Sequence, residues 1–322
     1  MALPRLLRGT VAGALASAAL AGFNYLADEA APPLEPWLEG DRRDYTWRMG
    51  RVRYTVAGPE AGEPLLMVHG IHAAASSYEF RRNFGVFADE GYRVYALDLL
   101  GFGQSERPAL DYDDELYIAL ISDFLRDVID QPAIVIVTSL SGSFVVPTAL
   151  RHPDRITKLV MIAPVGLERL RSETAVSGAL LRGFVRSPLV GEGFFNLLTT
   201  RPSLRYFMGE QGYHDSSLVT DEMIDHYYAT SHQPNARYAV AAFVSGRLNR
   251  DLRNEWPRVT QPTLLVWGNY ATTTPAKDGT EFLRLNPRAV VDGYDANLLP
   301  HDEQSERFNR QTLAWLQGRR KD

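Results

Sequence analysis

The chain has 322 residues, of which 45% are hydrophobic and 23% charged, a composition typical of a globular protein and unlike that of a disordered one. Its formal net charge of -5 provides no basic surface, so we expect no nucleic-acid partner. The absence of cysteine excludes disulfides, thiolate zinc sites and cysteine nucleophiles. The seven histidines form no HExxH-type ligand pair, and we therefore expect no metal and no cofactor.

The N-terminal segment, residues 1–36, is distinct from the rest of the chain. Arg5 and Arg8 precede an Ala/Gly-rich stretch without charge, and acidic residues begin only at Asp28. This pattern is typical of a signal peptide or a single membrane anchor, and it predicts possible membrane contact through residues 1–27. A helix packed on the domain is the alternative, so an exported or anchored location and a cytoplasmic one both stay open. The proline-rich end of the segment indicates a linker.

The body of the chain alternates short apolar runs with longer helical patterns, which predicts an α/β fold with a mostly parallel central sheet flanked by helices. Expected helices are residues 113–129 and 308–316. The expected strands are residues 51–57, 65–68, 94–97, 134–137, 159–162, 264–267 and 289–291.

Residues 166–259 differ from this pattern, because they lack βα alternation and contain many aromatic residues. They predict a helical cap or lid, inserted into a core formed by residues 37–165 and 260–322. The lid aromatics suggest an apolar pocket wall, and a small apolar substrate or ligand is the expected partner. The sequence makes no prediction about oligomeric state.

Four motifs follow one another in the body. HGIH at residues 69–72 follows a predicted strand, and DLLGFGQS at 98–105 follows the next. TSLSG at 138–142 ends the β-branched run, and RHPDR at 151–155 ends the helix after it. In this order and spacing they resemble the α/β-hydrolase superfamily of the lidded type. The resemblance implies an oxyanion loop, a nucleophile elbow and a serine nucleophile.

Two serines compete for the nucleophile position. Ser139 directly follows the apolar strand and lies fourteen residues before Pro153, as the family's serine does. Its neighbour two positions earlier, Val137, is bulky for an elbow. Ser141 has the smaller flanking residues, Ser139 and Ser143. We favour Ser139, and Ser141 remains the alternative.

The resemblance also implies roles for residues around the elbow. The backbone N–H groups of Leu140 and Ile71 would hold the oxyanion. His69 is expected to brace its loop rather than to transfer protons, and Asp98 to organise the following loop rather than to serve as the acid of a triad.

The family's acid and histidine are not at their usual positions. Ala271 occupies the acid position after the WG step, and residues 297–298 (Asn-Leu) occupy the GH position. His301 lies three residues further on and is the candidate base, and a surface histidine that helps to start the last helix is the alternative. Asp295 is taken as its acid; the other candidate acids are Asp278 and Asp302.

These observations predict a serine hydrolase with a non-standard triad of Ser139, His301 and Asp295, esterase-like on a small apolar ester or acyl substrate. The alternative is a catalytically degenerate pseudo-hydrolase that binds an apolar small molecule under its lid. The apolar replacements at the acid and histidine positions favour that alternative, because a serine without a base loses several orders of magnitude in rate.

Overall fold

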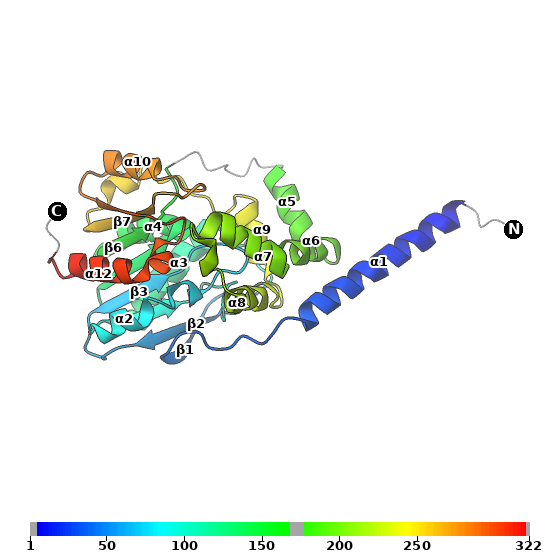
Figure 1. The fold of residues 1–322 in the computed structure, drawn as a ribbon, viewed down its shortest axis with the longest axis horizontal. Coiled ribbons are helices and arrows are strands. Elements are labelled where there is room, and N and C mark those ends of the chain that lie inside the picture. Colours follow the sequence, from blue (N-terminus) through cyan, green and yellow to red (C-terminus); the bar gives the residue numbers. More distant parts are fainter. Residues whose placement is uncertain (1–4, 168–176, 320–322) are drawn as a thin grey trace.

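A computed structural model of the protein describes residues 5–167 and 177–319. In that part of the chain eight strands form one sheet, in the order β1-β2-β4-β3-β5-β6-β7-β8 (Figure 1). The first two pairings are antiparallel: β1 and β2 form a hairpin, and β2 pairs with β4. All later neighbours are parallel. The strands are β1 (Asp41–Trp47), β2 (Gly50–Ala57), β3 (Pro64–Val68), β4 (Arg93–Leu97), β5 (Ala133–Thr138), β6 (Ile156–Ile162), β7 (Thr263–Gly268) and β8 (Val290–Tyr294).

The centre of the sheet is buried on both faces. All residues of β3, β5 and β7 are buried, which explains why their sequences are continuous apolar runs rather than alternating ones. Alternate residues of β5 enter different hydrophobic clusters. Val135 and Val137 pack on one face, while Ile134 and Ile136 pack on the other.

Helices cover the two faces. On the Val135 side lie α3 (Asp114–Phe124), α4 (Gly142–Arg151) and α10 (Lys277–Leu285); on the other side lie α2 (Phe84–Asp89) and α12 (Ser305–Leu316). The mostly parallel, helix-flanked α/β fold is confirmed. The structure adds one strand that the sequence did not predict, β1. Its first four residues, DRRD, are exposed, so the strand has no apolar alternation and is formed by its backbone pairing with β2.

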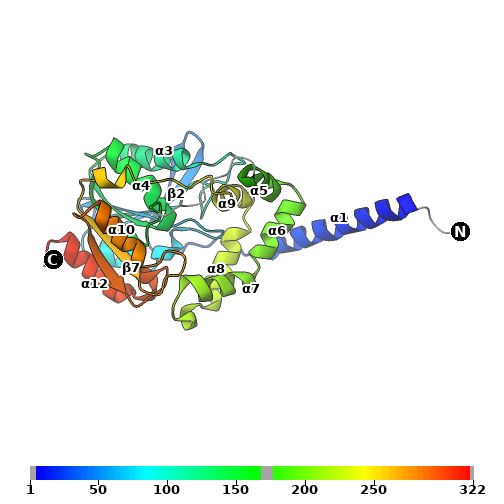
Figure 2. The ribbon, with the colours of Figure 1, turned by 90° about the horizontal axis from the view of Figure 1, so that it is seen from above.

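All regular structure described between β6 and β7 is helical. Its main elements are α5 (Ser177–Arg186), α6 (Val190–Leu198), α7 (Arg201–Phe207), α8 (Asp221–Ser231) and α9 (Arg237–Val244). These helices gather at one end of the sheet, on the side from which α1 leaves (Figures 1 and 2). Of these helices, α7 and α8 contribute to an apolar cluster that also contains Tyr78 and Leu299 of the core. Residues 168–176 of the predicted lid, 166–259, lie outside the described residues. We use the name lid for residues 177–259, and that this segment covers a binding site stays a prediction.

The N-terminal helix α1 (Arg5–Glu29) extends away from the body (Figure 1). Its last turns pack on the lid: Asn24 Nδ2 donates to the carbonyl of Leu189 at 3.0 Å. After α1 the linker crosses to the core, where Trp37 Nε1 donates to Ser77 Oγ at 3.0 Å. Among the described residues, no helix combines the length and the apolarity needed to cross a membrane.

Candidate active site

Ser139 occupies a sharp bend between the central strand and a helix. β5 ends at Thr138, and α4 begins at Gly142. The φ angle of Ser139 is 52°, in the left-handed region that non-glycine residues rarely adopt. Such a conformation costs on the order of 1–3 kcal/mol and is typical of functional sites. The side chain of Ser139 is half-buried, and its hydroxyl makes no hydrogen bond with any residue the structure describes.

The neighbouring serines are engaged in backbone contacts. Ser141 Oγ donates to the carbonyl of His69 at 2.6 Å, and it is fully buried. Ser143 Oγ donates to the carbonyl of Leu140 at 2.7 Å. Ser141 therefore ties the bend to the loop after β3, and the available hydroxyl at the bend is that of Ser139.

The loop after β3 lies against this bend. A Cβ on Gly70 would lie 3.5 Å from the Cβ of Ser139. The backbone N–H of Ile71 donates to no acceptor in the described parts of the chain. Leu140 lies in the 3₁₀ turn that starts the helix, where backbone N–H groups have no acceptor within the turn. The amides of Ile71 and Leu140 are thus available beside Ser139.

His69 links two loops and leaves no nitrogen for catalysis. Its Nδ1 donates to the carbonyl of Gly70 at 2.6 Å, and its Nε2 accepts the N–H of Leu99 at 3.0 Å. These contacts fix the neutral tautomer. Burial lowers the pKa of His69 to about 4, so the ring stays neutral at physiological pH.

Asp98 organises the loop that follows β4. Its carboxylate accepts the backbone N–H of Ser77 at 2.7 Å and that of Gln104 at 2.9 Å. Gly103 packs directly on it: a Cβ there would lie 2.2 Å from the Asp98 carboxyl carbon. Burial raises the pKa of Asp98, and its carboxylate joins the loop after β4 to the segment that begins at Ser77.

The family's usual acid and histidine positions carry no titratable group. Ala271 is buried, and its N–H bonds to the carbonyl of Gly268 at 3.2 Å. Leu298 is half-buried and packs on the apolar cluster that contains Tyr213 and Tyr227 of the lid. This position, where the family keeps its base, is therefore part of the contact between lid and core.

The structure does not assemble the expected relay of Ser139, His301 and Asp295. The His301 ring is fully buried between Phe80 and Phe308, at centroid distances of 5.4 and 5.9 Å. Neither ring nitrogen has a hydrogen-bond partner within the described residues. Burial lowers the pKa of His301 to about 4. Because it is buried, His301 is not the surface histidine of the alternative interpretation either.

The candidate acids lie elsewhere. Asp295 is exposed and accepts from Asn269 Nδ2 at 3.1 Å. Asp302 is buried and ion-paired with Arg81 at 2.8 Å, and it also accepts the hydroxyl of Tyr213. None of these carboxylates bonds to an imidazole in the described structure, and Asp278 is half-buried on α10 without such a partner.

Sequence reasoning missed two groups near the bend. Glu79 is buried, and both of its carboxylate oxygens lie 3.2 Å from the N of Gly70. Burial raises its pKa to about 8. His72 follows Ile71 and packs edge-on against Tyr227, with a centroid distance of 5.7 Å. The signal for Glu79 was that it is the only acidic residue among residues 71–80, which follow the HG step.

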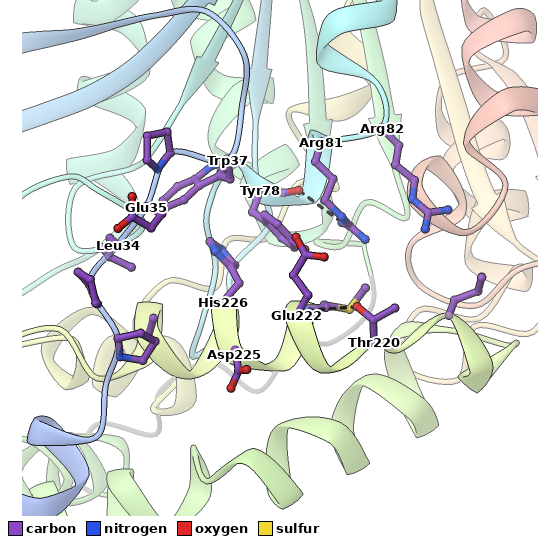
Figure 3. Close-up of a pocket in the computed structure, with 16 residues that line it drawn as sticks. Leu34, Glu35, Trp37, Tyr78, Arg81, Arg82, Thr220, Glu222, Asp225 and His226 are labelled. Carbon is purple, nitrogen blue, oxygen red and sulfur yellow. Dashed lines mark hydrogen bonds between the residues drawn. The ribbon is translucent and has the colours of Figure 1, made fainter.

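A cavity of about 500 Å³ lies between the linker, the segment after the HG loop and α8 (Figure 3). Its volume is in the range of small-molecule pockets. Trp37, Tyr78 and His226 form an aromatic wall, and the guanidinium of Arg81 lies over the Tyr78 ring, 4.4 Å from its centroid. His226 stacks on Tyr78 at 3.9 Å, and Ser139 does not line this cavity.

Comparison with known proteins agrees with this geometry. Residues 63–301 match the alpha/beta hydrolase fold family, and the chain belongs to that family. It is 27% identical over 274 residues to the 2-hydroxy-6-oxononadienedioate/2-hydroxy-6-oxononatrienedioate hydrolase of Comamonas testosteroni, covering 83% of this chain and 91% of that protein.

Two solved structures show the same fold. A serine hydrolase involved in carbazole degradation superimposes with a TM-score of 0.69 at 23% identity, covering 86% of this chain and 98% of that one. The carboxylesterase CesB of Bacillus subtilis superimposes with a TM-score of 0.69 at 18% identity, covering 94% of this chain and 98% of that one. The relatives are hydrolases of the same general kind, and the chain is a general α/β-hydrolase-fold protein.

Proposed function

We propose that the chain is a serine hydrolase, esterase-like on small apolar esters, with Ser139 as the nucleophile. The observation that carries this proposal is the left-handed φ of 52° at Ser139, beside a free hydroxyl and two available amides. A strained bend with an unbonded hydroxyl has no structural purpose of its own, because Ser141 already supplies the contact that ties the bend to its neighbouring loop.

In the proposed mechanism, Ser139 Oγ attacks the ester carbonyl carbon. The oxygen of the tetrahedral intermediate becomes an anion and accepts the N–H groups of Ile71 and Leu140. Collapse expels the alcohol and leaves an acyl-serine, which water then hydrolyses to the acid and free Ser139. The serine proton passes to solvent, because no imidazole is within hydrogen-bonding distance in the described structure.

The missing relay sets the expected rate. An oxyanion hole and binding alone retain roughly 10³–10⁴-fold acceleration over water when a triad is removed. We therefore expect slow turnover, limited to esters with good leaving groups such as p-nitrophenyl acetate and butyrate.

Hydrolysis of p-nitrophenyl butyrate tests the proposal directly. Ser139→Ala is expected to lower the rate and to abolish the acyl-enzyme burst, because the nucleophile is lost while the oxyanion amides remain. Ser141→Ala is expected to keep the burst, because its hydroxyl contacts the His69 carbonyl and not the substrate. Thermal melting of both variants checks that they are folded. Equal activity of Ser139→Ala and the unsubstituted protein would refute the assignment.

A second candidate is a binding protein that keeps the fold without turnover. Two observations favour it: Ala271 and Leu298 replace the acid and histidine, and the cavity of about 500 Å³ is not lined by Ser139. Under this proposal the ligand occupies the cavity beside Trp37, and Trp37→Ala abolishes ligand-induced thermal stabilisation. Ester hydrolysis that depends on Ser139 would contradict it.

A further inference from the structure

Exposed apolar side chains are concentrated at one end of the molecule. Among the side chains that the structure describes, sixteen large apolar ones are exposed, and thirteen of these lie on α1 or in the lid. The sheet and its flanking helices contribute only three. The most exposed include Leu26 at 66%, Leu180 at 69%, Leu197 at 59% and Tyr206 at 65%, which lie on α1, α5, α6 and α7. Single exposed apolar residues are ordinary, but such a concentration marks a contact surface.

Helix α1 and the lid form one continuous surface. A Cβ on Gly193 of α6 would lie 2.4 Å from Leu20 Cδ1, so the end of α1 packs closely on α6. From there α1 runs outward, away from the sheet, in both views (Figures 1 and 2). Its 25 residues correspond to roughly 37 Å at 1.5 Å per residue.

Residues 9–27, which make up most of α1, contain no charged residue. A helix that packs by one side on a globular partner or a second copy of the chain carries charged residues on the side that faces water. Phe23, Tyr25 and Leu26, near the end of α1, are exposed apolar side chains. The lack of charge along α1 therefore favours the headgroup and acyl boundary of a bilayer over a protein as the occupant of this surface.

The charges of the surface are compatible with lipid headgroups. Helices α5, α6 and α7 carry four arginines and a single acidic residue, Glu192, in a chain with a net charge of -5. All four arginines are ion-paired: Arg182 and Arg186 with Asp111, and Arg201 and Arg205 with aspartates of α8. The electrostatic attraction to anionic headgroups is therefore modest, and burial of apolar side chains provides most of the binding.

We propose that α1 and the outward sides of α5, α6 and α7, together called the lid face, dock on a lipid bilayer. This proposal does not depend on the activity of Ser139. Docking through the lid face places the lid against the membrane. The sheet and its flanking helices then lie on the aqueous side.

Flotation of the full-length protein with vesicles of phosphatidylglycerol and phosphatidylethanolamine tests the proposal. The unsubstituted protein is expected to float with the vesicles, and Phe194→Glu with Leu197→Glu to reduce the bound fraction at least tenfold. A matched control changes Val86→Glu and Met49→Glu on the core, because Val86 and Phe194 are equally exposed, both at 39%. The control variant is expected to bind as the unsubstituted protein does.

Two results would overturn the proposal. One is equal flotation of the lid-face and control variants, with both folded by circular dichroism. The other is a protein that does not float with vesicles but self-associates in analytical ultracentrifugation, while the lid-face variant is monomeric. The surface would then be an interface between copies of the chain.

The dependence on lipid charge is expected to be weak. The floated fraction should increase only slightly with the phosphatidylglycerol fraction of the vesicles.

Discussion

Both carboxylate oxygens of Glu79 lie 3.2 Å from the backbone nitrogen of Gly70, in the loop that faces Ser139. The buried Glu79 thus contacts the loop after β3, which contains His69 and Gly70. Ser141 ties the same loop to the bend through the His69 carbonyl. The geometry beside Ser139 is maintained by groups that do not themselves contact a substrate.

The pH dependence of stability reports on Glu79. Burial raises its pKa from 4.5 in the unfolded chain to about 8 in the fold. Between these values the folded state binds more protons than the unfolded state, so stability falls as pH rises. The slope is at most about 1.4 kcal/mol per pH unit. Urea unfolding of the unsubstituted protein is expected to show a lower free energy of unfolding at pH 8 than at pH 6.5. Glu79→Gln is expected to remove most of this difference. An equal pH dependence of the free energy of unfolding in the two proteins would contradict the prediction.

Substitution of His301 separates structure from catalysis. Its pKa is lowered to about 4 by burial, so the unfolded state gains a proton first as pH falls below 6.5, and the unsubstituted protein loses stability. His301→Leu lacks this loss. As the pH is lowered from 7 to 5, its free energy of unfolding is expected to rise by up to about 2 kcal/mol relative to that of the unsubstituted protein. Esterase activity per folded molecule should not change. A strong loss of activity would restore His301 as the base.

Gly103 cannot carry a side chain. Its φ of +52° is left-handed, and a Cβ would lie 2.2 Å from the Asp98 carboxyl carbon. We expect Gly103→Ala to destabilise the protein by about 2 kcal/mol or more. Gly85→Ala is the matched control, because no atom lies within 4 Å of its Cβ and alanine favours the helix. Equal melting temperatures of the two variants would disprove the role of Gly103.

Returning the family's residues to their usual positions should accelerate hydrolysis. Ala271→Asp with Leu298→His places an acid and an imidazole where the family keeps them. General-base assistance contributes typically about 10²–10⁴-fold, and kcat/KM for p-nitrophenyl butyrate is expected to rise by at least about tenfold. Each single variant serves as a control and is expected to gain less. A double variant that is folded but no faster would show that the bend is not competent for catalysis.

The sequence predicted the parts of this structure that depend on local pattern. The apolar runs identified the buried strands, and the spacing from Pro153 identified the bend at Ser139, whose left-handed φ agrees with it. β1 was missed because an exposed edge strand has no apolar pattern to detect.

The relay could not be predicted in the same way, because long-range contacts determine the environments of its members. Asn83 Nδ2 holds the His301 carbonyl at 2.8 Å across 218 residues, and Phe80 and Phe308 enclose the ring. Neither contact has a signature in the local sequence of His301. The burial of Glu79 is likewise a property of the assembled fold.

Reaction with a fluorophosphonate followed by peptide mass spectrometry tests the role of Ser139 most directly. The account predicts a slowly formed single adduct on the peptide that contains Ser139, absent from Ser139→Ala and present in Ser141→Ala. A folded protein that remains unmodified at saturating reagent, or an adduct on Ser141 instead, would contradict it.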